Sequence, residues 1–151
     1  MPFKKSCLAA HNEFRAKHGA APLELCPELN KSAQAWADHL SSSGEFNHSS
    51  RSENIGESIF SINNSFPYDF TGEIAAHCWY EELKDYNFND TEEEIKSKIK
   101  KVANFTQMVW CDTEKLGVGY VVSKGSCLIV AQYEPSGNIL GNFKKNVLIE
   151  K

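Results

Sequence analysis

The stretch KLGVGYVVSKGSCLIVAQYEP, residues 115–135, decides the fold class of this 151-residue chain. Its first half alternates larger apolar side chains with smaller ones, which is typical of a strand with one buried face (Val118, Tyr120 and Val122). Its second half is continuously apolar over residues 127–131, as expected for a strand that is covered on both faces. Residues 123–126 lie between the halves and supply the turn. The stretch therefore predicts a β-hairpin inside a covered sheet.

Helical patterns precede this hairpin. One runs over about residues 4–18 and ends at Gly19. A second begins near Pro27 and ends before Gly44, with its apolar side chains on a single face (Leu29, Ala33, Trp36, Ala37 and Leu40). A third covers about residues 71–86. Because helices come first and the hairpin last, the sequence predicts an α+β fold with a mainly antiparallel sheet between helical layers.

The segment NDTEEEIKSKIKKVANF, residues 89–105, also has a helical signature. Thr91 and Glu94 fit a capping box, and acidic residues precede lysines as the helix dipole favours. A solvated surface helix explains this pattern better than a basic binding patch.

The composition excludes several classes of protein. The chain is 41% hydrophobic and 24% charged, which is ordinary for a globular protein. No apolar run reaches the roughly 20 residues of a membrane span, and no apolar signal peptide is visible at the start. A net charge of −4 argues against nucleic acid as a partner. The five cysteines form no CxxC pair, and we expect them to be reduced in an intracellular chain.

Glu82 is the informative carboxylate of the third helix. On a helical wheel of about 100° per residue it falls inside the apolar stripe formed by Ala75, Trp79 and Leu83, whereas Glu81 falls outside it. A carboxylate that faces the core requires a partner, because burying it unpaired is costly. We therefore expect Glu82 to belong to an internal polar site.

Seven motifs occur in an order that resembles the CAP superfamily of cysteine-rich secretory proteins, venom allergens and pathogenesis-related proteins. They are AHNEFR at 10–15, PLEL at 22–25, NHS around His48, SENIG around Glu53, WYEE at 79–82, NFTQMVW at 104–110 and YEPSGN at 133–138. The resemblance covers about residues 8–147. It implies one CAP domain over residues 1–151, built as a three-layer α-β-α sandwich with a central cleft.

The cleft of this family usually holds two histidines and two glutamates. By position these correspond to His48, Glu53, Glu82 and, for the second histidine, Asn104. His48, Glu53 and Glu82 could hold a metal, but a neutral amide oxygen suits calcium better than zinc. We therefore expect tight zinc binding to be lost, with no resident cofactor and at most a weakly bound divalent cation such as zinc, calcium or magnesium. The alternative is that the four residues form a hydrogen-bonded cluster that fixes the cleft walls.

Two positions indicate the branch of the family. Secreted relatives typically carry cysteines where this chain has residues 116–119 and 130–133, which contain none. The chain is more similar to the intracellular Golgi-associated branch and to venom-allergen-like proteins without a signal. That branch implies peripheral association with anionic membranes, lipid binding and homodimers, although the usual myristoylation signal is absent. We expect a cytoplasmic or Golgi-peripheral location, with secretion as the alternative.

A further segment, residues 59–70, is rich in aromatic side chains that could contact lipid or sterol (Phe60, Phe66, Tyr68 and Phe70). The alternative, that they cap the core, is favoured. Together these features predict a non-enzymatic protein that binds lipid or a protein partner. A secreted effector of the venom-allergen type, and a weak hydrolase that uses His48 and a glutamate, are the alternatives.

Overall fold

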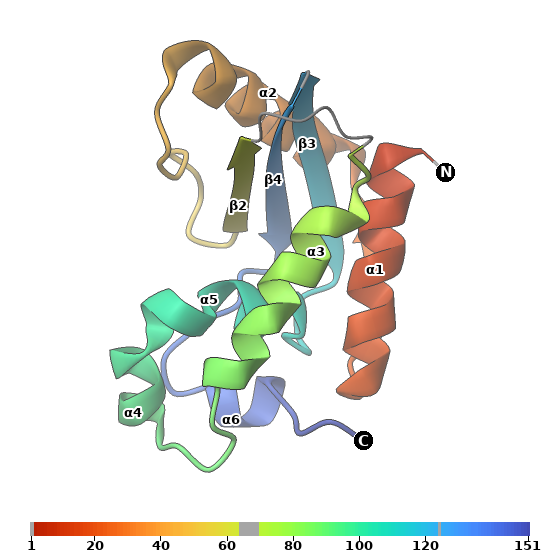
Figure 1. Cartoon of the computed structure of the whole chain (residues 1–151). Helices are drawn as coiled ribbons and strands as arrows, with labels where there is room; N and C mark the ends of the chain where they lie inside the picture. The colour runs from red at the N-terminus through yellow and green to blue at the C-terminus, as the bar shows by residue number, and fades with distance from the viewer. Residues whose placement is uncertain (1, 64–69, 124) are drawn as a thin grey trace.

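A four-stranded sheet between two helical layers forms the centre of the computed structural model, which describes residues 2–63, 70–123 and 125–151 (Figure 1). The strand order is β1-β3-β4-β2. The short β1 (Glu24–Leu25) is parallel to β3 (Lys115–Ser123), while β4 (Ser126–Glu134) is antiparallel to both β3 and β2 (Gly56–Asn63). The predicted α+β sandwich with a mainly antiparallel sheet is thereby confirmed.

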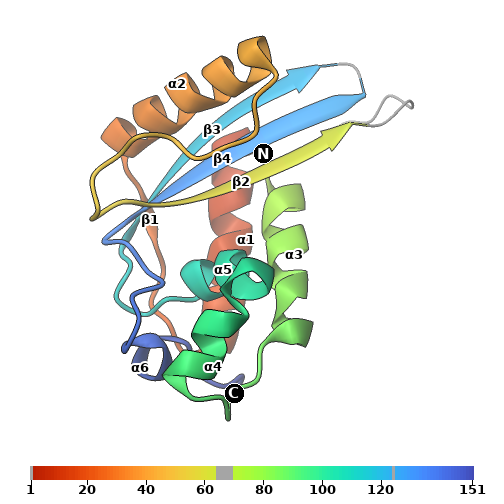
Figure 2. The same cartoon turned by 90° about the vertical axis from the view of Figure 1, so that its left-hand side faces the viewer.

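The two helical layers are unequal. Figure 2 shows α2 (Pro27–Ser43) on one face of the sheet, and α1 (Phe3–Lys17), α3 (Glu73–Tyr80) and α5 (Ile99–Met108) on the other. The short α4 (Glu92–Ser97) and α6 (Phe143–Asn146) lie at the end of the larger layer that is farther from the sheet. None of the described helices is long and apolar enough to cross a bilayer.

Local sequence signals account for both ends of α2 and for the start of α4. Helix α2 has Pro27 in its first turn and ends at Gly44, whose φ of 76° favours glycine because it has no Cβ. Thr91 and Glu94 form the predicted capping box of α4.

Two predicted helices differ in detail. The third changes after Tyr80 into a 3₁₀ helix over Glu81–Asp85. The segment predicted as one surface helix is two helices, because Lys98 leaves the helical conformation at φ −106° and its ammonium bonds Asp90 at 2.8 Å.

Strand β4 is covered on both faces, as its continuous apolar run predicts. Cys127, Ile129 and Ala131 pack into the larger core beneath α1 and α3, whereas Val130 packs with residues of α2. Helix α2 lies very close to β3, since a Cβ on Gly119 would stand 2.3 Å from the backbone of Ala33.

The amide side chains of α2 also occupy the outer edge of β3. Asn30 Oδ1 accepts from the backbone N–H of Val118 at 2.8 Å, and Gln34 Oε1 accepts from that of Tyr120 at 3.0 Å. Gln34 Nε2 donates back to the Tyr120 carbonyl at 2.8 Å. These bonds satisfy backbone groups that β1 is too short to reach.

A buried guanidinium fastens α1 to the chain beyond α5. Arg15 is fully buried, and its nitrogens donate to the carbonyls of Ala21, Met108, Trp110 and Thr113 at 2.7 to 3.0 Å. This arrangement satisfies a charge that would otherwise be costly to bury.

Candidate functional site

Glu57, the second residue of β2, is the centre of the first half of the site. Its side chain is fully buried, and its Oε1 accepts from His48 Nδ1 and from the backbone N–H of Ser49, both at 2.9 Å. Its Oε2 accepts from Ser49 Oγ at 2.7 Å and from Gln132 Nε2 at 2.9 Å. Burial raises the pKa of Glu57, but the hydrogen bonds from His48, Gln132 and Ser49 outweigh it and hold the pKa down to about 2. Glu57 is therefore ionised at neutral pH, and the hydrogen bonds from these donors stabilise its buried charge.

The carboxylate fixes the orientation and tautomer of His48. Because an ionised carboxylate only accepts hydrogen bonds, Nδ1 of His48 must carry the proton. In the neutral imidazole Nε2 then carries the lone pair, and the side chain is 57% exposed. The pair therefore presents a nitrogen acceptor at the surface.

Glu82 and Asn104 form the second half. Glu82 Oε1 accepts from the backbone N–H groups of Asn104 and Phe105 at 2.9 and 3.0 Å. Glu82 Oε2 accepts from Asn104 Nδ2 at 2.8 Å. Burial raises the pKa of Glu82 and is opposed by these bonds, with the net direction upward. The helical periodicity that turned Glu82 inward thus identified a paired carboxylate, although the local helix is 3₁₀.

His48 and Asn104 meet at one cavity, which we name the His48 cavity. Its volume is about 180 Å³, and five residues line it: Phe46, Asn47, His48, Ile59 and Asn104. Two of the three polar lining residues have a carboxylate behind them, Glu57 for His48 and Glu82 for Asn104.

The structure does not bring Glu53 to this site. Glu53 is exposed in a turn before β2, and Glu57 contacts His48 in its place. The motif SENIG lies just outside the strand, so its glutamate points to solvent. The sequence feature that could have identified Glu57 is the strand pattern of residues 56–60, in which alternate side chains turn to the same face.

The donor groups at the site do not fit a zinc ion well. Among the residues that the structure describes, no group of three or more His, Cys, Asp or Glu side chains is arranged around a metal position. The oxygens of Glu57 and Glu82 already accept from protein donors, which leaves His48 Nε2 and the Asn104 oxygen. Zinc sites use three or four protein ligands. Weak binding of a divalent cation stays a prediction.

The aromatic segment is only partly described. Phe60 lies within β2, not in a loop, and both Phe60 and Phe70 are half-buried against the larger core. Phe66 and Tyr68 lie outside the described residues. The packing of the first two agrees with a core-capping role, and a lipid contact stays a prediction.

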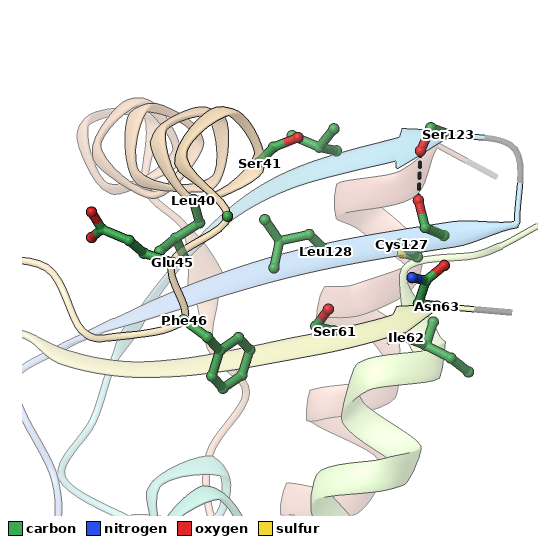
Figure 3. Close-up of a pocket in the computed structure, with 13 residues that line it drawn as sticks. Leu40, Ser41, Glu45, Phe46, Ser61, Ile62, Asn63, Ser123, Cys127 and Leu128 are labelled. Atoms are coloured by element: carbon green, nitrogen blue, oxygen red, sulfur yellow. Dashed lines mark hydrogen bonds between the residues drawn. The ribbon is translucent and has the colours of Figure 1, made fainter.

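A second hollow lies beyond the end of α2; we name it the Leu128 cavity. Its volume is about 350 Å³. Figure 3 shows Leu40 of α2 and Leu128 of β4 facing one another, with Phe46 below them and Glu45 pointing away. Serines and an asparagine form its outer rim (Ser61, Asn63, Ser123 and Ser126), and the Ser123 and Ser126 hydroxyls bond each other at 2.5 Å.

All five cysteines lie in the described part of the chain, and none is in a disulfide. Cys7, Cys26 and Cys127 are buried, Cys111 is half-buried and Cys78 is exposed.

Comparisons with known proteins agree with this architecture. The model of the cysteine-rich secretory protein family, CAP, matches residues 8–133. The human Golgi-associated plant pathogenesis-related protein 1 is 40% identical, over 99% of this chain and 94% of its own length. Pathogenesis-related leaf protein 4 of Solanum lycopersicum is 31% identical, over 89% of this chain and 78% of its own.

Solved structures show the same fold. The Schistosoma mansoni venom allergen-like protein 4 superposes with a TM-score of 0.67 at 22% identity, covering 97% of this chain and 94% of that one. The hookworm platelet inhibitor superposes with a TM-score of 0.66 at 21% identity, covering 97% and 75%. A single domain over all of residues 1–151 stays a prediction.

Proposed function

The chain belongs to the CAP, or cysteine-rich secretory protein, family, and on this premise we propose that it is a non-enzymatic binding protein whose ligand site is the His48 cavity. One observation carries the proposal. The amide of Asn104 donates to Glu82, whose two oxygens accept three hydrogen bonds from Asn104 and Phe105. A carboxylate held in this way positions a wall of the cavity, and an amide does not accept a proton near neutral pH.

The surroundings of His48 also favour binding over hydrolysis. A nucleophile activated by His48 would need to lie within hydrogen-bond reach of Nε2. The nearby hydroxyl of Ser49 instead donates to Glu57, on the other side of the ring. In the described residues no serine, threonine or cysteine is hydrogen-bonded to the imidazole. These contacts support a surface that recognises a ligand without transforming it.

We propose that the partner is a lipid membrane with anionic headgroups, to which this chain binds as a peripheral protein. Support comes from the 40% identity to a protein named for its association with the Golgi. Lys96, Lys100 and Lys101 are exposed on α4 and α5 and offer local attraction, although the net charge is −4. The alternative partner at the same cleft is another protein, either a second copy of this chain or a different one.

Vesicle sedimentation tests the membrane proposal. The protein should sediment with vesicles of phosphatidylcholine and phosphatidylserine at low salt, and less with phosphatidylcholine alone. The double substitution Lys100→Glu and Lys101→Glu should weaken the effect, whereas Lys17→Glu on α1 serves as the matched control. No sedimentation with anionic vesicles at low salt would contradict the proposal.

A secreted effector is the second candidate, favoured by 26% identity to venom allergen 5 of Microctonus hyperodae. Such a role would go with disulfides in an oxidising compartment. Thiol titration of the unreduced, unfolded protein distinguishes the two, because five free thiols would contradict the secreted form.

A further inference from the structure

The His48 cavity presents two hydrogen-bond acceptors that have no protein partner in the described residues. The Nδ1–H of His48 donates a hydrogen bond to Glu57, so that in the neutral imidazole Nε2 is a hydrogen-bond acceptor. Asn104 must direct its NH₂ group to Glu82, because a carboxylate accepts and does not donate; its oxygen is then left over. Both residues line the same cavity. A ligand that satisfies them has to donate hydrogen bonds.

The charged groups at the site also bear on which donor group the ligand carries. Glu57 and Glu82 stand directly behind the two acceptors, and neither is exposed. Arg51 is a cation at this site: its Nη1 lies 3.6 Å from Glu57 Oε1 and also donates to the Ser49 carbonyl. Two exposed lysines, Lys100 and Lys101, stand four and three residues before Asn104 on α5. The other polar lining residue, Asn47, carries an amide that both donates and accepts. Glu57 and Glu82 therefore favour an ammonium over a carboxylate or phosphate at these two acceptors, so the attraction to anionic headgroups falls to the exposed lysines and not to the cavity.

The His48 cavity and the Leu128 cavity share one lining residue, which is apolar. Phe46 lines both, and its residue is 63% exposed. Along β2, Ile59 lines the first cavity, while Ser61 and Asn63 line the second. Alternate residues of a strand share one face at about 3.3 Å per residue, so the two cavities are consecutive over about 13 Å. Glu45 is the charged residue among those that line the second cavity, and its carboxylate points away from Leu128 (Figure 3).

We propose that these two cavities form one site for a single-chain amphiphile with a donor-bearing head, a primary amine, whose ammonium bonds His48 Nε2 and Asn104 Oδ1 and whose alkyl chain crosses Phe46 to Leu40 and Leu128. This inference rests on the proposed function and specifies the ligand of the same cleft. It separates this chain from a carrier of fatty acids, because a carboxylate has no donor to offer.

Calorimetric titration with four decyl compounds, each below its critical micelle concentration, tests which head group the site prefers. Decylamine should bind at least about tenfold more tightly than decanoate, since charge-assisted hydrogen bonds are replaced by repulsion. Decyltrimethylammonium controls for charge, because it is a cation without N–H donors, and decanol is a donor without charge. Equal affinity for decyltrimethylammonium and decylamine would overturn the proposal.

Two substitutions separate the contribution of the ligand's head group to affinity from that of its alkyl chain. His48→Lys replaces an acceptor by a cationic donor and should reverse the order of decylamine and decanoate. Leu128→Ser should weaken decylamine several-fold but leave butylamine unchanged, because the shorter chain does not reach Leu128. Ile149→Ala, an exposed apolar residue outside both cavities, is the control. Thermal melts of each variant confirm that it is folded.

The result also distinguishes this inference from the proposed function. Binding to anionic vesicles without a preference for decylamine overturns the inference and leaves the proposed function in place. If the protein binds neither anionic vesicles nor decylamine, both the inference and the proposed function are overturned.

Discussion

Glu57→Gln is the substitution whose effect the structure determines most fully. The hydrogen bonds from His48, Ser49 and Gln132 lower the pKa of Glu57 from its ordinary value of 4.5 to about 2. At 1.36 kcal/mol per unit, a difference of about 2.5 units corresponds to about 3 kcal/mol of folding free energy at neutral pH. For a chain of this size the variant should melt about 6 to 12 °C lower than wild type.

The pH dependence gives the sharper test. A carboxyl whose pKa is lowered by folding contributes its full stability above its unfolded pKa, near 4.5, and loses it as the pH falls toward the folded value near 2. The difference between wild type and Glu57→Gln in urea unfolding should therefore be about 3 kcal/mol at pH 7 and shrink as the pH falls to about 2.

Glu53→Gln is the matched control, because Glu53 is an exposed glutamate four residues away. It should change the free energy of unfolding by less than about 0.5 kcal/mol at any pH. A larger effect from Glu53→Gln than from Glu57→Gln, or a Glu57→Gln effect that does not vary with pH, would refute the reasoning.

Three further substitutions test other parts of the structure. Arg15→Met removes the donors to three buried carbonyls and to the Ala21 carbonyl, and should lower the free energy of unfolding in urea by at least about 3 kcal/mol, whereas the exposed Lys17→Met should lower it little. Asn104→His should raise zinc affinity in calorimetry by about tenfold or more, since it restores a second imidazole; unchanged affinity would show that Asn104 does not stand at a ligand position. Gly119→Ala puts a Cβ 2.3 Å from the backbone of Ala33 and should cost more than about 2 kcal/mol in thermal unfolding, and a neutral result would contradict the close packing of α2 on β3.

The sequence predicted the parts of the molecule that follow a local period. The hairpin, the first two helices and the inward direction of Glu82 all follow from repeating patterns in which the direction of each side chain is fixed by the element. The capping box of α4 was visible for the same reason, because both of its partners lie three residues apart.

The remaining features depend on contacts between distant segments. Residues 44–55 have no period, so the assignment of Glu53 depended on the SENIG motif alone and missed Glu57; with β2 beginning at Gly56, it is Glu57 that bonds His48. The carbonyls that Arg15 binds belong to irregular segments and helix ends far along the chain. The break between α4 and α5 was also not apparent, since Lys98 is as compatible with a helix as its neighbours.

The amides of α2 on β3 bear on how this sheet can associate with another chain. A strand edge with free N–H and C=O groups can template the addition of a foreign strand, which is a route to aggregation. Asn30 and Gln34 imitate a neighbouring strand by bonding the backbone of Val118 and Tyr120, so that edge is capped at these two residues. A foreign strand that added beyond β3 would first have to displace these amide hydrogen bonds, and two side chains of α2 thereby protect the sheet from growth on that side.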